Sequence, residues 1–226
     1  MNRLATEFTD TAVEPDQDNH NYFAKVQAVT ALLAAEFVKR GITISTAESC
    51  TGGMLAAAIT EMPGSSTWFE YGVVSYSNIA KQKLLDVPPA IFTEHGAVSK
   101  ACVIEMAGGA LRRSDSGVAV SVSGIAGPDG ATSGKPVGTV WVGWAMAADL
   151  TGCPSASSVD TGRSTGADQA IQTFAQHFEF IGNRRQVREQ AVLSALHGTI
   201  ARLHSLENTN CDQPEVQINH QVEMKQ

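Results

Sequence analysis

The segment Ala47-Glu48-Ser49-Cys50-Thr51-Gly52-Gly53 restricts the fold of this chain more than any other, because it separates two runs of opposite conformational preference. Residues 42–46, before it, are rich in β-branched side chains, which suit a pleated strand. Residues 54–59, after it, are rich in Ala and Leu, which favour a helix. Since glycine tolerates the backbone angles of a tight turn, the order strand, turn, helix is predicted.

This turn allows two interpretations of Ser49 and Thr51. The first N–H groups of a helix lack internal partners and carry partial positive charge, so they suit a phosphate or a developing oxyanion. A serine nucleophile needs such a position. Alternatively, Ser49 or Thr51 only caps the helix, which is the common role of such residues. The turn by itself leaves both interpretations open.

Strands and helices alternate along the rest of the chain. The predicted strands are 42–46, 68–76, 118–122, 139–145 and 177–181. The predicted helices are 22–40, 53–60, 77–85, 98–111 and 184–206. Ser77-Asn78 is predicted to cap the third of them. Residues 90–96 are predicted to be a connector, and residues 149–168 a mobile insertion or a long hairpin tip. This alternation predicts one α/β domain with a mixed, mostly parallel sheet and helices on both faces.

Ligands of open α/β sheets gather where loops leave the carboxyl ends of strands. The loops at 47–53, 75–78 and 123–130 each follow a predicted strand. We therefore expect these three loops to line one pocket.

The two ends of the chain differ in composition from its middle. Residues 1–21 are predicted to be a flexible acidic leader, 22–206 the folded domain, and 207–226 a disordered acidic tail. The ends account for the whole formal net charge of -7, which argues against nucleic acid as a main partner. Because there is no apolar run of about 18 residues and the N-terminus is polar, we expect a soluble cytoplasmic protein without a membrane partner.

The cysteines do not have the spacing of a metal site. Cys50, Cys102, Cys153 and Cys211 form no CxxC or His-Cys pattern, which predicts reduced thiols and neither a disulfide framework nor a zinc site. Cys50 adjoins Ser49 and is either a thiol activated at a helix N-terminus or a small buried hydrophobe. The buried hydrophobe is the favoured interpretation.

A serine hydroxyl requires a neighbouring base. None of the six histidines is tied to a loop signal, so a Ser-His-Asp triad is unsupported. A lysine can serve as the base where burial keeps its amine neutral. Tyr76 ends a predicted strand and Lys81 lies one turn into the next helix, so both could act on one serine. The alternative is a surface lysine beside a tyrosine at the edge of the core.

Two further features could bind a ligand. The loop Ser123-Gly124-Ile125-Ala126-Gly127-Pro128-Asp129-Gly130 lacks the spacing of a P-loop or of GxGxxG, but its backbone N–H groups could contact a ligand. An ordinary tight turn is equally consistent with it. Arg184 and Arg188 lie four residues apart at the start of a helix and could together bind a phosphate or carboxylate, although exposed arginines are common on helices.

Six segments taken in order are more specific than any single motif. They are TAESCTGG (46–53), PGSS-WFE-G-V-YSN-AK (63–81), HGAVS (95–99), SGIAGPDG (123–130), KPVGTVW (135–141) and GNRRQVR (182–188). In this order they resemble the CinA C-terminal domain family, of the stand-alone PncC type, over most of the chain between its two tails.

This resemblance implies hydrolysis of nicotinamide mononucleotide to nicotinic acid mononucleotide and ammonia, in pyridine-nucleotide salvage, without a metal or cofactor. The family's nucleophile falls on Ser49, and its tyrosine and lysine fall on Tyr76 and Lys81. The resemblance implies that Lys81 and Tyr76 together relay the proton to the departing ammonia. N–H groups near Thr51–Gly53 would hold the oxyanion. The residues expected to contact the substrate are Thr51, Gly52, Gly53, Asn78, Gly124, Ala126, Gly127, Arg184 and Arg188. The resemblance also implies a homo-oligomer, a dimer or higher.

The sequence departs from the family in two respects. It has no counterpart of the nucleotide-pyrophosphatase domain of longer CinA proteins, so that activity is not expected. Residues 149–176 look longer than is usual between the last strands. Two alternatives to the amidase remain, a nucleotide-binding or regulatory protein with little deamidase activity and an amidase for another carboxamide.

Overall fold

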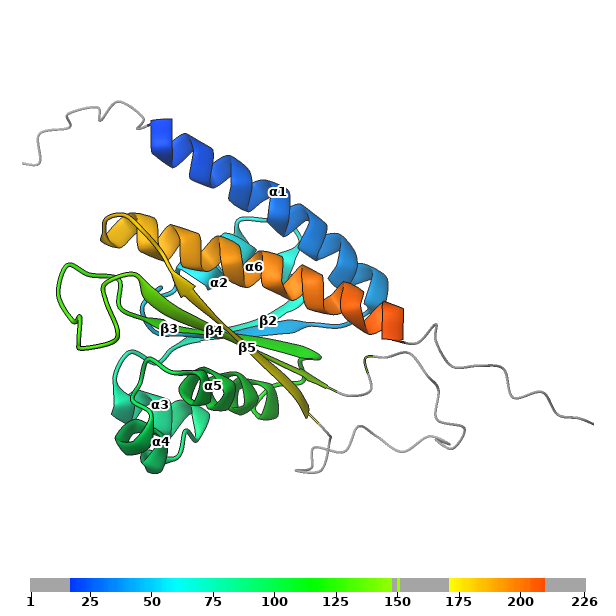
Figure 1. Ribbon diagram of the computed structural model, residues 1–226. Helices are drawn as coiled ribbons and strands as arrows, with labels where there is room; N and C mark the ends of the chain where they lie inside the picture. Colours follow the sequence, from blue (N-terminus) through cyan, green and yellow to red (C-terminus); the bar gives the residue numbers. More distant parts are fainter. Residues whose placement is uncertain (1–16, 148–149, 151–170, 210–226) are drawn as a thin grey trace, which may run out of the picture.

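The computed structural model describes residues 17–147, 150 and 171–209 as a five-stranded sheet with helices on both faces (Figure 1). The strands are β1 (Ile44–Glu48), β2 (Phe69–Val74), β3 (Val118–Gly124), β4 (Thr139–Ala147) and β5 (Ile171–Glu179). The helices are α1 (Gln17–Arg40), α2 (Met54–Thr60), α3 (Asn78–Leu85), α4 (Pro89–Glu94), α5 (Lys100–Arg112), α6 (Arg184–Thr209) and a short 3₁₀ turn η1 (Ser65–Thr67).

The sheet is mixed, with strand order β2-β1-β3-β4-β5. β1 pairs in parallel with β2 and with β3, whereas β4 runs antiparallel to both β3 and β5. β4 is thus the one strand of this sheet that runs against the others. The predicted α/β class, with a mixed sheet and helices on both faces, is confirmed.

The topology brings the predicted loops to one edge of the sheet. The chain leaves β1 towards β2 on one side and leaves β3 towards β4 on the other, so the strand order reverses between β1 and β3. Such a reversal is where α/β sheets commonly bind ligands. The carboxyl ends of β1, β2 and β3 lie at this edge, and β5 ends there too, because Glu179 pairs with Thr139 at the start of β4. The same edge therefore also receives the start of α6.

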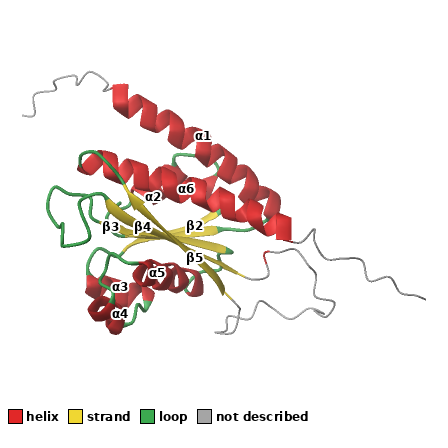
Figure 2. Cartoon of the chain, viewed as in Figure 1, coloured by secondary structure: helices red, strands yellow, loops and turns green. Residues whose placement is uncertain are grey.

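The core lies in two layers, one on each side of the sheet. Figure 2 shows α1, α2 and α6 over one face and α3, α4 and α5 over the other. β1 and β3 are buried on both faces, as expected for central strands of a sheet that is covered by helices on both sides. On the α3 side the backbones approach closely, since a Cβ on Gly109 of α5 would lie 1.9 Å from the Leu85 carbonyl oxygen. Glycine is therefore required where α5 meets the end of α3.

Most predicted elements are present, with three corrections. The predicted connector 90–96 is mostly helical, because Pro89 opens α4 in the first turn, where proline's missing N–H costs nothing. The first strand is 44–48 instead of 42–46, since its pairing with β2 and β3 extends through Glu48. The last strand is 171–179 instead of 177–181; as an edge strand with little burial it lacks a clear hydrophobic alternation.

Other sequence predictions lie partly or wholly outside the described residues. α1 begins at Gln17, before the predicted start at residue 22 and within the predicted flexible leader, and α6 ends at Thr209 instead of residue 206. The rest of the leader and tail, and nearly all of the predicted insertion before β5, lie outside the described part. None of the described helices combines the length and apolar character needed to span a bilayer.

Candidate active site

Ser49 is the first residue after β1, at the reversal of strand order. Its N–H donates to the carbonyl oxygen of Val122 in β3 at 3.0 Å, and its own carbonyl accepts from the N–H of Gly52 at 3.1 Å. The residue is 9% exposed. The serine is therefore held by main-chain bonds to a central strand and to its own turn, with a small part of its surface open.

Glu48, the last residue of β1, caps the N-terminus of α2 with its side chain. Its carboxylate accepts three backbone N–H groups, from Gly53 at 2.9 Å, Leu55 at 3.0 Å and Ala56 at 2.8 Å. The N-cap residue Gly53 has no side chain to do this. The predicted oxyanion site near Thr51–Gly53 therefore needs correction, because the Gly53 N–H is already bound and that of Gly52 donates to Ser49.

Lys81 lies in α3 and is buried, with 1% of its surface exposed. The helix begins where Ser77 caps it by accepting the N–H of Ala80 at 3.0 Å, as the sequence predicted. One turn later the Lys81 amine lies 2.9 Å from Ser49 Oγ, 2.7 Å from the carbonyl oxygen of Ser75 and 3.4 Å from that of Tyr76. The alternative of a surface lysine is thus wrong.

The three oxygens around this amine define the direction of its lone pair. A neutral amine has two N–H donors and one lone pair, whereas a carbonyl oxygen can only accept. If the carbonyls of Ser75 and Tyr76 take the two N–H groups, the lone pair is directed at Ser49 Oγ. The serine hydroxyl then donates to the amine, which is the arrangement of a nucleophile and its base.

The surroundings of Lys81 favour this neutral form. Burial lowers the pKa of its amine, and the thiols of Cys102 and Cys50 act in the opposite direction. No carboxylate among the described residues contacts the amine. Burial also raises the pKa of the Cys50 thiol to about 12, so Cys50 is the buried hydrophobe of the two interpretations and not an activated thiol.

Arg184, the first residue of α6, links two of the predicted loops. Its guanidinium donates to the Gly127 carbonyl at 2.7 Å and to the Tyr76 hydroxyl at 3.0 Å. Both acceptors are uncharged, so these two contacts leave its positive charge unneutralised. The Tyr76 side chain is 59% exposed, and the contact between Tyr76 and Lys81 is made by the tyrosine carbonyl.

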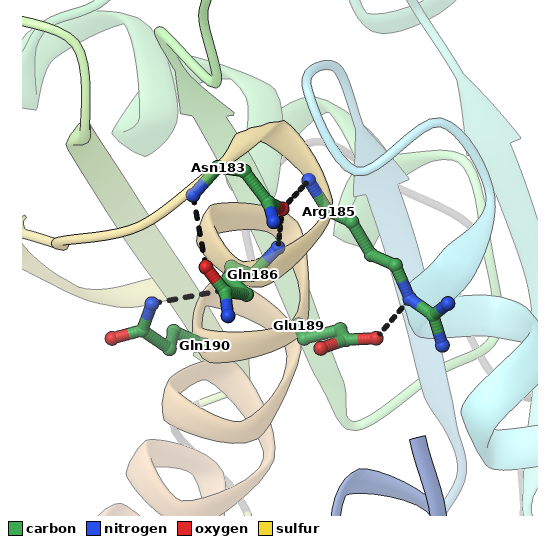
Figure 3. A network of polar contacts seen from close by, with 5 residues as sticks. All are labelled: Asn183, Arg185, Gln186, Glu189 and Gln190. Carbon is green, nitrogen blue, oxygen red and sulfur yellow. Dashed lines mark hydrogen bonds and ion pairs between the residues drawn. The ribbon is translucent and has the colours of Figure 1, made fainter. Parts of the chain in front are cut away.

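A capping box fixes the start of α6 and hence the position of Arg184. Figure 3 shows Asn183 and Gln186 bonded reciprocally. Asn183 Oδ1 accepts the N–H groups of Arg185 and Gln186, and Gln186 Oε1 accepts the N–H of Asn183. One turn further on, Arg188 donates to the Thr51 carbonyl at 2.7 Å. α6 therefore contacts the Ser49 turn through Arg188 and the loops at 75–78 and 123–130 through Arg184.

The structure joins most of the predicted site residues but not all of them. Ser49, Thr51, Tyr76, Lys81, Gly127, Arg184 and Arg188 are connected by the contacts above. Asn78 is exposed at the start of α3, and its side chain has no hydrogen bond to another described residue. Gly124 is required for strand packing, because a Cβ there would lie 2.6 Å from a Val140 methyl, and Ala126 is part of the core.

One residue of the site went unrecognised in the sequence. Glu48 is acidic at the end of a buried strand, and the following helix has glycine at its N-cap. A helix start without a capping side chain, preceded by a buried acid, is the signal that could have identified it. Among the described residues, no three His, Cys, Asp or Glu side chains gather in a way that could hold a metal ion.

Comparison with known proteins gives consistent matches. The model of the CinA C-terminal domain matches residues 26–165. The PncC nicotinamide-nucleotide amidohydrolase of Enterobacter agglomerans is 42% identical over 172 residues, which cover 76% of this chain and 92% of that protein. A protein of Symbiobacterium thermophilum, whose name describes it as competence-damage inducible, is 48% identical over 170 residues; these cover 75% of this chain but only 36% of that longer protein.

A solved structure shares the fold. The competence damage-inducible protein A of Klebsiella pneumoniae is 35% identical, with a TM-score of 0.67, and the match covers 79% of this chain and 97% of that one. The fold and the order of the elements that carry Ser49 and Lys81 therefore have a counterpart of known structure.

Proposed function

Because the chain belongs to the CinA C-terminal domain family, we propose that it hydrolyses the carboxamide of nicotinamide mononucleotide to give nicotinic acid mononucleotide and ammonia. Relatives of similar length are named nicotinamide-nucleotide amidohydrolases, which supports this substrate. One structural observation supports the chemistry more than any other, the buried Lys81 amine 2.9 Å from Ser49 Oγ.

In this proposal Ser49 attacks the carboxamide carbon while the neutral Lys81 amine takes the hydroxyl proton. The protonated amine then gives that proton to the departing nitrogen, which leaves as ammonia, and the acyl group stays on Ser49. Water attacks the acyl-enzyme with Lys81 again as base, which releases the acid and restores the serine. Burial supports both steps, since the lowered pKa of Lys81 leaves its amine neutral and able to accept the serine proton, and makes the protonated amine a better proton donor.

The oxyanion requires donors that the folded chain has not already used. The N–H groups of Cys50 and Thr51 donate to no other residue of the described chain, and both follow Ser49 directly. We therefore assign them the role that the sequence had placed at Thr51–Gly53. Arg184 is assigned to the substrate phosphate, because its present partners are neutral and a phosphate would bind it more strongly.

Tyr76 has a different role in this scheme from the proton relay that the resemblance implies. Its exposed hydroxyl accepts from Arg184, while its carbonyl accepts from Lys81. The side chain therefore orients Arg184, and the main chain orients the base. A cytoplasmic location and a homo-oligomeric state stay predictions.

The first test is ammonia release from nicotinamide mononucleotide by the purified protein and by Ser49→Ala. We expect the parent to release stoichiometric ammonia and Ser49→Ala to be slower by at least about 10³-fold, as in other enzymes that lose their nucleophile. Ser66→Ala is the matched control, since it makes the same change at an exposed serine outside the site and should keep the parental activity.

Each outcome separates the candidate functions. No ammonia from the parent, together with tight binding of the nucleotide, would favour a binding or regulatory protein. Ammonia from other carboxamides but not from this one would indicate a different amidase. Equal rates in the parent and in Ser49→Ala would exclude Ser49 as the nucleophile.

A further inference from the structure

We infer that Glu48 is a positioning residue for the Ser49 nucleophile, acting through the backbone of the turn that carries it. The inference rests on the proposed function only in taking Ser49 as the nucleophile, and not on the identity of the substrate. Glu48 is 1% exposed, adjoins Ser49 in sequence, and is an acid at a position where burial of an unpaired charge would be strongly unfavourable.

The carboxylate is fully engaged by the main chain. One oxygen accepts from Gly53 and Leu55, and the other accepts from Ala56. Neither oxygen contacts Ser49 Oγ or the Lys81 amine in the described structure, so Glu48 is not a proton carrier. Its charge is instead balanced by the N–H groups at the start of α2, an arrangement that stabilises a carboxylate.

A hydrogen bond of Glu48 joins the two ends of the turn that contains Ser49. The side chain of Glu48 binds one end of the turn at Gly53, and its main chain forms the other end, so the intervening residues Ser49–Gly52 have fixed end points. The carbonyl of Glu48 also accepts the N–H of Ser75 at 2.8 Å, and the carbonyl of Ser75 in turn accepts from Lys81. One residue therefore connects the turn of the nucleophile to the loop that orients the base.

α2 depends on this carboxylate for its orientation. The helix has seven residues and begins at a glycine in the left-handed region, φ 95°, which provides no side-chain cap. Without Glu48, the N–H groups of Gly53, Leu55 and Ala56 would lose their partners, and the turn could adopt other conformations. Ser49 would then spend only part of its time within reach of Lys81.

The test uses a fluorophosphonate probe, whose phosphorus is attacked by Ser49 Oγ with loss of fluoride, so it reports nucleophile activation without the nucleotide. We would measure the labelling rate from pH 6 to pH 10 by intact mass for the parent, Glu48→Gln and Glu48→Asp, with Ser49→Ala as the blank. Glutamine keeps the size but replaces one acceptor oxygen with an NH₂ group that faces a donor. Aspartate keeps the charge but is too short to reach all three N–H groups.

We expect Glu48→Gln to label at least tenfold more slowly than the parent, Glu48→Asp to lie between them, and the pH midpoint to stay that of Lys81. Ser99→Ala is the matched control, because Ser99 caps α5 by accepting the N–H of Cys102 at 3.1 Å and carries no site residue. That control should lower the melting temperature and leave the labelling rate unchanged, which separates positioning from general loss of stability.

A parental labelling rate in folded Glu48→Gln, or a shifted pH midpoint, would overturn the inference, and so would a parent that the probe does not label at Ser49. If neither Glu48 variant folds, the inference is tested instead by the rate of amide hydrogen exchange at Gly53 in the parent protein. Slow exchange of the Gly53 amide, which lies outside the internal bonding of α2, is expected, and exchange at the rate of a free amide would contradict the inference. A parent that is labelled but releases no ammonia from the nucleotide would refute the proposed substrate alone.

Discussion

The pair Ser49–Lys81 and the pair Tyr76–Arg184 lie at the same edge of the sheet but differ in burial. Lys81 is 1% exposed and is bonded to two main-chain carbonyls, whereas Tyr76 is 59% exposed and Arg184 is exposed as well. We call the first the inner pair and the second the outer pair. The difference indicates that the groups proposed to react are preorganised by the fold, while the groups proposed to bind substrate can still change partners.

Replacing Lys81, the proposed base of the inner pair, should have the largest effect. Lys81→Met removes the amine while keeping an unbranched side chain, and we expect the rate of ammonia release to fall by at least about 10³-fold. The control is Lys83→Met, an exposed lysine on the same helix, which should keep the parental rate. A rate in Lys81→Met within tenfold of the parent would show that another group is the base.

The same variant makes a prediction about stability and pH. Because burial lowers the pKa of Lys81 in the folded state, the folded protein binds fewer protons than the unfolded chain between that pKa and the ordinary lysine value of about 10.4. Burying the protonated Lys81 amine destabilises the folded state. This destabilisation is complete below the folded pKa and disappears as the pH rises towards about 10.4. The melting temperature of Lys81→Met relative to the parent should therefore be highest at low pH and decline with rising pH, as calorimetry would show. For the same reason, kcat/KM of the parent should rise with pH through the pKa of Lys81.

In the outer pair, Arg184→Ala should change binding and leave the chemistry nearly intact. We expect KM to rise about 10- to 100-fold, which corresponds to about 1.4–2.7 kcal/mol, with kcat within about threefold of the parent. Arg185→Ala, the neighbouring guanidinium that pairs with Glu189 at 2.7 Å, is the matched control and should leave KM unchanged. A loss confined to kcat would mean that Arg184 acts in the chemical step.

Tyr76→Phe should have the smallest effect, because it removes one hydrogen bond to Arg184 and leaves the carbonyl that faces Lys81 in place. We expect KM to rise about two- to fivefold, the effect of one exposed hydrogen bond, with kcat unchanged. Steady-state kinetics beside Arg184→Ala would check this. A drop in kcat of a hundredfold or more would restore the proton-relay role of the phenol and would erase the distinction between the two pairs.

The sequence predicted the parts of the site that depend on local order. The strand–turn–helix around Ser49 and the cap at Ser77 follow from residue types alone, and the parallel arrangement of three strands then places their loops together. The helix 89–94 was missed because two consecutive prolines indicate the end of one helix as readily as the start of another.

The burial of Lys81 and the role of Glu48 could not be predicted from local sequence. The segment NIAKQKLL has two lysines two positions apart, and only packing against α5 and the ends of β1 and β2 distinguishes the buried one from the exposed one. Predicting the role of Glu48 would have required knowing that the start of α2 folds back over the end of β1. Both features depend on contacts between segments that the chain brings together only in the folded sheet.

The carbonyls that orient Lys81 have a consequence for how this sequence can diverge. Because Ser75 and Tyr76 contribute main-chain oxygens, no side-chain replacement at either position removes an acceptor from the amine. Under the proposed mechanism, relatives could therefore vary residue 76 without removing an acceptor that orients the Lys81 amine. At this edge of the sheet, side chains can therefore change during evolution while the backbone keeps the acceptors that orient Lys81.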